Sequence, residues 1–309
     1  MNCETEFKVC CDPQRLIRAR EIARELKSDA PAMELRELLE AVLGLRSCRL
    51  QVSQKGLILI EDLAVKHCFG FAAGTYGLLV TPTPGLGDWA DGTGIAVDAD
   101  HPDALVNVYL GHDTESALAA KHAEECLGDE AFGEVLGIPP CCRRFYSNLT
   151  FNIPSSDFHF HWRSVVAHPQ EIEVPAGANF LGRYFGRSFV SHFPCSVTCP
   201  ATRQQTLSRF GLISAIDQQF AEHIAAAHYW SYLVTRKEGI VAYRSTLPAS
   251  DGTSFDLKGA LPLNRRRNGA PRWCRIRVQP DHITLQDTGG RLVDIETSHA
   301  RFLRPRGEY

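Results

Sequence analysis

The chain has 309 residues, a formal net charge of −3 and 22% charged residues, values typical of a soluble globular protein. This balance excludes a disordered chain, a fibrous protein and a small fold stapled by disulfides. A chain of this length buries a full hydrophobic core by itself, so we expect any metal site to serve function rather than to rescue the fold.

The start of the chain and its hydropathy predict a cytoplasmic protein with no membrane partner. Residues 1–6 are polar and acidic, unlike the basic start of a signal peptide. The sequence also has no run of about 18 uncharged apolar residues. In a reducing cytoplasm the 11 cysteines serve as core residues, metal ligands or nucleophiles rather than as disulfides.

The first part of the sequence predicts a helical lead-in followed by strands and helices. Apolar residues recur at helical spacing over 14–26 and 33–45. Short apolar runs rich in β-branched residues then predict strands, at 57–60, 76–81, 94–97 and 105–110. Asp113 is a typical N-cap, and further helices are expected over 114–126 and 130–136, the second ending at Gly137.

The second part predicts one long helix and a β-rich end. Apolar residues recur at near-helical spacing from Pro200 to about Ala227. Short alternating runs follow, with the Asp287-Thr288-Gly289-Gly290 segment as a hairpin turn. We therefore expect an α+β fold with three regions, namely a helical N-terminal region (1–50), a central α/β metal-binding domain (51–228) and a β-rich C-terminal region (229–309).

Two segments concentrate the cysteine chemistry. In Pro139-Pro140-Cys141-Cys142, proline is favoured in the first turn of a helix, so the two cysteines should begin one. Adjacent helical residues point about 100° apart, which favours Cys142 as the ligand and leaves Cys141 to packing. In the segment from Cys195 to Cys199, Pro200 places Cys199 at the start of the next helix.

Cysteines at helix starts are favoured as thiolates, because the free amides and the helix dipole stabilise negative charge. Cys142, Cys195 and Cys199, with His192 as a candidate fourth ligand and Cys141 as the alternative to Cys142, suit an iron–sulfur cluster or zinc by ligand softness. Their spacing fits no common zinc finger. Two other interpretations stay open, namely a metal-free reactive thiol and buried cysteines that simply pack.

At these residues the sequence resembles an uncharacterised prokaryotic family, domain of unknown function 483. The resemblance lies in Leu136-Gly137-Ile138-Pro139-Pro140-Cys141-Cys142 with Phe145, and in His192-Phe193-Pro194-Cys195 with Cys199. It covers about residues 100–225 and implies no settled activity.

Several other side chains are candidates for catalysis or substrate binding. His192, Glu134 and Tyr146 are candidate general acids or bases beside the cysteines. Arg143 is a candidate to hold a substrate carboxylate through its two-pronged guanidinium. A polar helix face also explains Glu134 and Tyr146, and a surface or charge-balancing role also explains Arg143.

The leading hypothesis is a metalloenzyme that binds an iron–sulfur cluster, of the 4Fe-4S type, through three cysteines. One open iron would then serve lyase or sulfur-transfer chemistry on a small polar substrate. The alternative is a binding module in which the three cysteines and His192 form a closed zinc site. This module would contact RNA or a protein partner through Arg265, Arg266 and Arg267.

Overall fold

The computed structural model describes most of the chain, which divides into two compact units. The described residues are 12–26, 30–80, 95–152, 164–165, 171–235, 239–248, 254–262, 273–279, 281–296 and 300–306. The first unit holds the described residues up to 80, those from 95 to 152 and those from 205 to 224. The second unit holds the described residues from 164 to 204 and from 225 onward.

The first unit is built on an antiparallel four-stranded sheet in the order β1-β4-β2-β3. Its strands are β1 (Cys48–Val52), β2 (Gly70–Leu79), β3 (Ile95–Asp98) and β4 (Leu105–Gly111). The helices that precede residue 153 are α1 (Pro13–Leu26), α2 (Ala32–Val42), α3 (Gln54–His67), α4 (Thr114–His122), α5 (Asp129–Val135) and α6 (Pro140–Asn152). Two later helices, α8 (Pro200–Ile216) and α9 (Gln218–Ala225), carry residues 205–224.

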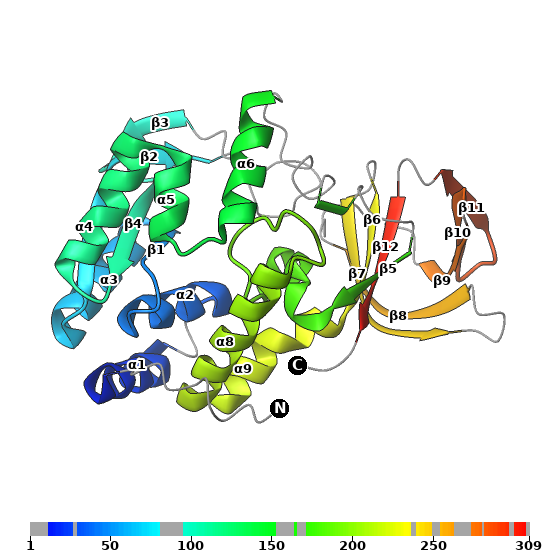
Figure 1. Ribbon diagram of the computed structural model, residues 1–309, viewed down its shortest axis with the longest axis horizontal. Helices are drawn as coiled ribbons and strands as arrows, with labels where there is room; N and C mark the ends of the chain where they lie inside the picture. The colour runs from blue at the N-terminus through cyan, green and yellow to red at the C-terminus, as the bar shows by residue number, and fades with distance from the viewer. Residues whose placement is uncertain are drawn as a thin grey trace. The chain divides into compact units, whose positions relative to one another are not determined.

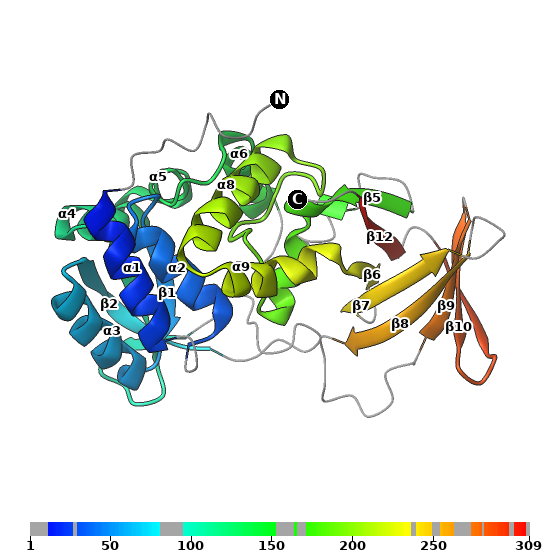
Figure 2. The same cartoon turned by 90° about the horizontal axis from the view of Figure 1, so that it is seen from below.

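Both faces of this sheet are buried. Successive residues of β4 point to opposite faces, and Val108, Tyr109 and Leu110 are all buried. Helix α4 packs against the face that carries Tyr109 and Ala72, as Figure 1 shows. Helices α2 and α3 pack against the sheet as well, with α1 lying on them (Figure 2).

The second unit is built on an eight-stranded sheet in the order β11-β10-β9-β8-β7-β6-β12-β5. Neighbouring strands are antiparallel except β12 and β5, which are parallel. The strands are β5 (Glu171–Pro175), β6 (Ser231–Thr235), β7 (Gly239–Pro248), β8 (Ser254–Pro262), β9 (Trp273–Val278), β10 (His282–Asp287), β11 (Leu292–Glu296) and β12 (Ala300–Arg306). The short helices are η2 (Ala176–Ala178), η3 (Phe180–Phe185) and η4 (Ala226–Tyr229).

Strand β6 divides the core of the second unit between the two faces of this sheet. Tyr232 and Val234 join a cluster that includes Phe180 of η3 and Val197 of the cysteine-bearing segment. Leu233 points the other way, into a cluster with residues of β8, β9 and β10. The loop that carries Cys195 and Cys199 is therefore anchored through Val197 in a packed core.

Two sequence predictions of secondary structure are wrong. Residues 57–60 form part of helix α3 rather than a strand. A short apolar run has no diagnostic period, and the buried positions Ile60, Leu63, Ala64 and His67 follow a helical face. The long helix expected after Pro200 is two helices, α8 and α9, with Asp217 between them.

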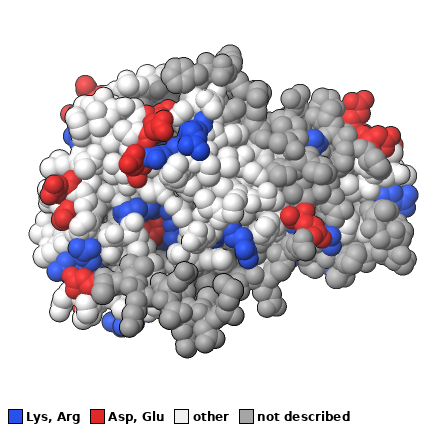
Figure 3. Space-filling model, in the orientation of Figure 1, with Lys and Arg blue, Asp and Glu red and all other residues white. Residues whose placement is uncertain are grey.

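The structure confirms the predicted α+β class with its β-rich C-terminal part, whereas the predicted domain boundaries at 50 and 228 stay predictions. Among the described residues, no helix is both long enough and apolar enough to cross a membrane. On the face shown in Figure 3, basic and acidic side chains of the described residues lie next to one another rather than gathering by sign.

Candidate metal centre

The first cysteine segment begins helix α6. Gly137, at φ +65°, ends the turn after α5 in the left-handed conformation that favours glycine, and Pro140 is the first residue of α6. The carbonyl oxygen of Pro139 accepts hydrogen bonds from the amides of Cys142 at 2.9 Å and Arg143 at 3.0 Å. Both cysteines therefore lie in the first helical turn, as the prolines predict.

The second segment is a tight loop that leads into α8. Ser164 Oγ donates a hydrogen bond to the carbonyl oxygen of Pro194 at 2.7 Å. The amide of Cys199 donates to the carbonyl oxygen of Ser196 at 3.1 Å, and the carbonyl oxygen of Cys199 accepts from the Arg203 amide at 3.0 Å. Cys199 thus occupies the cap position of α8, as Pro200 predicts.

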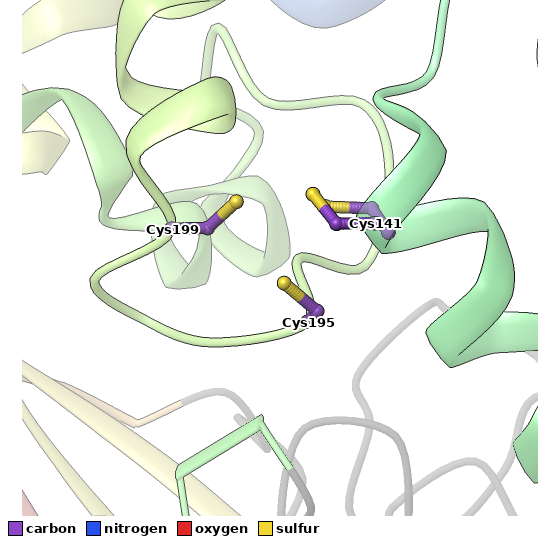
Figure 4. A group of neighbouring side chains, drawn as sticks. Cys141, Cys195 and Cys199 are labelled. Carbon is purple, nitrogen blue, oxygen red and sulfur yellow. The ribbon is translucent and has the colours of Figure 1, made fainter.

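These two segments bring four cysteines together. The Sγ atoms of Cys141, Cys142, Cys195 and Cys199 all lie within 4.8 Å of one another, an arrangement that is able to hold a metal ion. Cys142 and Cys199 are buried, whereas Cys141 and Cys195 are half-buried. Figure 4 shows the sulfur atoms pointing toward one another from the start of α6, the loop and the start of α8.

The expectation that only one cysteine of the adjacent pair would face the site is wrong, because Cys141 and Cys142 both face it. The Sγ atoms of Cys141 and Cys142 are 3.8 Å apart, and both belong to the group. An angle of about 100° between neighbours separates two side chains along a helix face. At the first turn of α6, however, no earlier helical turn separates the two side chains, so both sulfur atoms can reach the same point.

His192 lies outside the cysteine group. Its imidazole is buried, and its Nε2 is 2.9 Å from Thr202 Oγ1 in the first turn of α8. Among the described residues the metal-binding group consists of cysteines alone, so Cys141 takes the fourth place that His192 was a candidate to fill.

The remaining candidates near the cysteines contact other protein groups. Glu134 of α5 forms an ion pair with Arg143 of α6 at 2.8 Å, and among the described residues the buried Nε of Arg143 has no hydrogen-bond partner. Tyr146 is half-buried on α6. The arginines Arg265, Arg266 and Arg267 lie outside the described residues.

Comparison with protein-family models, with curated proteins and with solved structures finds no match to this chain. The resemblance to domain of unknown function 483 therefore stays a prediction.

Proposed function

We propose that Cys141, Cys142, Cys195 and Cys199 bind one zinc ion in a closed tetrahedral site, and that the protein is a binding module rather than an enzyme. The spacing of the sulfur atoms carries this proposal. A tetrahedron with metal–sulfur bonds of about 2.3 Å has sulfur–sulfur edges of about 3.8 Å. The Sγ atoms of Cys141 and Cys142 stand 3.8 Å apart, and no pair in the group exceeds 4.8 Å.

The same spacing argues against a four-iron cluster. In such a cluster each thiolate binds a different iron, so the sulfur atoms stand further apart than around a single ion. Four thiolates also fill the positions of a tetrahedral ion, which removes the open place that lyase or sulfur-transfer chemistry needs. Sulfur-only tetrahedral coordination is typical of zinc and of iron–sulfur centres, so the spacing of the sulfur atoms favours zinc.

Helix starts supply the charge that such a site requires. Four thiolates around a divalent cation leave a net charge of −2, and the amide-rich starts of α6 and α8 stabilise negative charge. Cys142 belongs to the first turn of α6 and Cys199 caps α8. The proposed ion would therefore cross-link two chain segments that are distant in sequence.

An iron–sulfur enzyme is the second candidate, because Cys141 and Cys195 are half-buried. This exposure favours a site that exchanges ligands with solvent or substrate. The 4Fe-4S centre with three cysteine ligands and an open iron would then bind a small polar substrate.

Cobalt replacement tests the zinc proposal. Chelator-treated protein titrated with Co²⁺ under anaerobic conditions should bind about one ion per chain and develop intense visible bands, as expected of a tetrahedral sulfur-ligated ion. Each Cys→Ser variant at 141, 142, 195 and 199 should weaken these bands and the binding. Cys126→Ser, which removes an exposed cysteine, is the matched control and should bind as the unaltered protein does.

Binding of Co²⁺ that persists unchanged in Cys141→Ser would contradict the four-cysteine site and restore a three-cysteine centre. In that case His192→Ala decides whether the imidazole completes the site.

A further inference from the structure

Two arginines lie against one tryptophan ring in the second unit. The guanidinium carbon of Arg187 lies 5.5 Å from the ring centroid of Trp230, and that of Arg244 lies 5.9 Å from it. Phe185 meets the same ring edge-on at a centroid distance of 5.9 Å. Trp230 itself is buried, so the core holds in place the ring that both guanidinium groups approach.

Independent backbone features fix the two arginines. Strands β6 and β7 pair antiparallel with Ser231 opposite Tyr243. Trp230 and Arg244 are the next residues beyond this pair, and they lie close together. Arg187 follows Gly186, which ends η3 at φ +71°, and its amide donates to the carbonyl oxygen of Gly182 at 3.0 Å. The convergence of these side chains therefore follows from the fold of the second unit.

Two other arginines that stack on aromatic rings have an acidic partner, whereas Arg187 and Arg244 have none among the described residues. Arg304 stacks on Phe255 and forms an ion pair with Glu173 at 2.7 Å. Arg49 stacks on Phe132 and pairs with Glu124. Within the described part of the chain, the side chains of Arg187 and Arg244 form neither an ion pair nor a hydrogen bond, so the donors of their guanidinium groups remain available to a ligand.

The positive charges of Arg187 and Arg244 also disfavour each other. Burial lowers the pKa of Arg187, and the neighbouring charge of Arg244 lowers it further. An anion between the two groups would relieve both costs. Guanidinium groups bind the oxygens of phosphate with paired N–H donors, and two of them match the double charge of a phosphate.

We propose that Arg187 and Arg244, held against Trp230, form a binding site for a phosphate group, carried by a small molecule or by the backbone of a single-stranded nucleic acid. This site goes beyond the cysteine centre, and its occupation does not depend on the metal.

Binding measurements on the full-length metal-loaded chain test the proposal. The probes are inorganic phosphate, followed by calorimetry, and a labelled single-stranded RNA of about ten nucleotides, a length within the usual site sizes, followed by fluorescence anisotropy. Arg187→Gln and Arg244→Gln should each weaken binding by about tenfold or more, because each removes charge-assisted hydrogen bonds. Arg304→Gln is the matched control, since its arginine also stacks on an aromatic ring but has an acidic partner, and it should bind normally.

The two probes separate the sources of phosphate. If the Gln variants lose binding of RNA alone, with a salt slope reduced by about one per arginine, the site binds a nucleic-acid backbone. If they lose binding of inorganic phosphate alone, the site binds a small phosphorylated ligand. If a Gln variant unfolds, Arg187→Lys and Arg244→Lys replace it, because they keep the charge and lose the paired donors. The proposal is overturned if the unaltered protein binds neither probe, or if the double variant binds both probes as tightly as the unaltered protein does.

Discussion

At the scale of single residues, the cysteines outside the four-cysteine group differ in their environments. Cys48 of β1 is fully buried, whereas Cys68 and Cys126 are exposed. Burial raises the pKa of the Cys48 thiol, and the charge of Glu37 raises it further. Because the thiolate is the reactive form, Cys48 should be inert in the folded protein.

Alkylation with iodoacetamide at about pH 8, near the ordinary thiol pKa, checks this prediction. Cys68 and Cys126 should react at least about tenfold faster than Cys48, because each unit of raised pKa removes about nine tenths of the remaining thiolate. Peptide mass spectrometry reads the modification at each site, and unfolded protein gives the reference rate. Rapid modification of Cys48 in the native state would show that β1 opens or that its thiol is accessible.

The residue-level chemistry of the cysteine centre was largely predictable from sequence. Proline in the first helical turn and cysteine beside it are local signals, and they place Cys142 and Cys199 at helix starts as the structure has them. That Cys141 belongs to the cysteine group and His192 does not depends on how the two segments meet in space. No local sequence pattern contains this information.

At the scale of elements, Asp217 separates α8 from α9. Its Oδ1 accepts a hydrogen bond from the Phe220 amide at 2.9 Å, the contact of an N-cap that begins a new helix. The apolar spacing continues across this position, so periodicity alone predicts one helix. Aspartate favours a cap over a helix interior, and this preference is the signal that distinguishes two helices from one.

Replacement of Asp217 tests this element boundary. Asp217→Ala should lower the free energy of unfolding by about 1 kcal/mol, the usual cost of a lost N-cap, whereas Asp217→Asn should keep most of the stability. Urea unfolding followed by circular dichroism measures both variants. Asp113→Ala gives a parallel comparison, because Asp113 caps α4 through the Ser116 amide at 2.8 Å. An Asp217→Ala variant as stable as the unaltered protein would contradict a stabilising N-cap at Asp217.

A buried charge network connects α2 with α8. Glu40 is fully buried and pairs with Arg36 at 2.8 Å, with Arg46 at 2.6 Å and with Arg209 of α8 at 3.6 Å. Burial alone would raise the pKa of Glu40, but the charges of Arg209, Arg36 and Arg46 outweigh it and lower the pKa to about 2. Burial lowers the pKa of Arg209 and the charge of Glu40 raises it. The net result is a pKa of about 10.

Removal of the Glu40 charge should be costly. Glu40→Gln removes the carboxylate that Arg36, Arg46 and Arg209 share, although Arg36 and Arg46 keep Glu37 as a partner. It should destabilise the protein by about 3–5 kcal/mol, the usual cost of breaking a buried pair. Glu25→Gln, which removes an exposed partner of Lys66, is the control and should change the unfolding midpoint little. An equal effect of both substitutions would contradict a special role for the buried network.

The same network gives the stability a defined pH dependence. The pKa of Glu40 is lower in the folded state than its ordinary value of 4.5, so its contribution is fully present above that value. The contribution is lost as the pH falls from about 4.5 toward 2. Unfolding free energies measured across this range should decrease more steeply for the unaltered protein than for Glu40→Gln.

At the scale of the whole molecule, the sequence predicts the α+β class and the β-rich end but not the two sheets. A short apolar run marks β4 and alternation marks β10. Neither pattern indicates that β12 lies between β6 and β5. Pairings of this kind are set by tertiary packing across long stretches of chain. The arginines around Trp230 were missed for the same reason, since they converge only when β6 and β7 pair beside η3.

A single metal ion held by four thiolates gives the purified protein a defined metal content. Anaerobic purification, followed by measurement of zinc, iron and acid-labile sulfide on one sample, tests it most directly. We expect about one zinc per chain, no sulfide and no visible absorbance. Iron together with sulfide, with broad absorbance near roughly 400 nm from thiolate-ligated clusters, would contradict it and establish the iron–sulfur alternative.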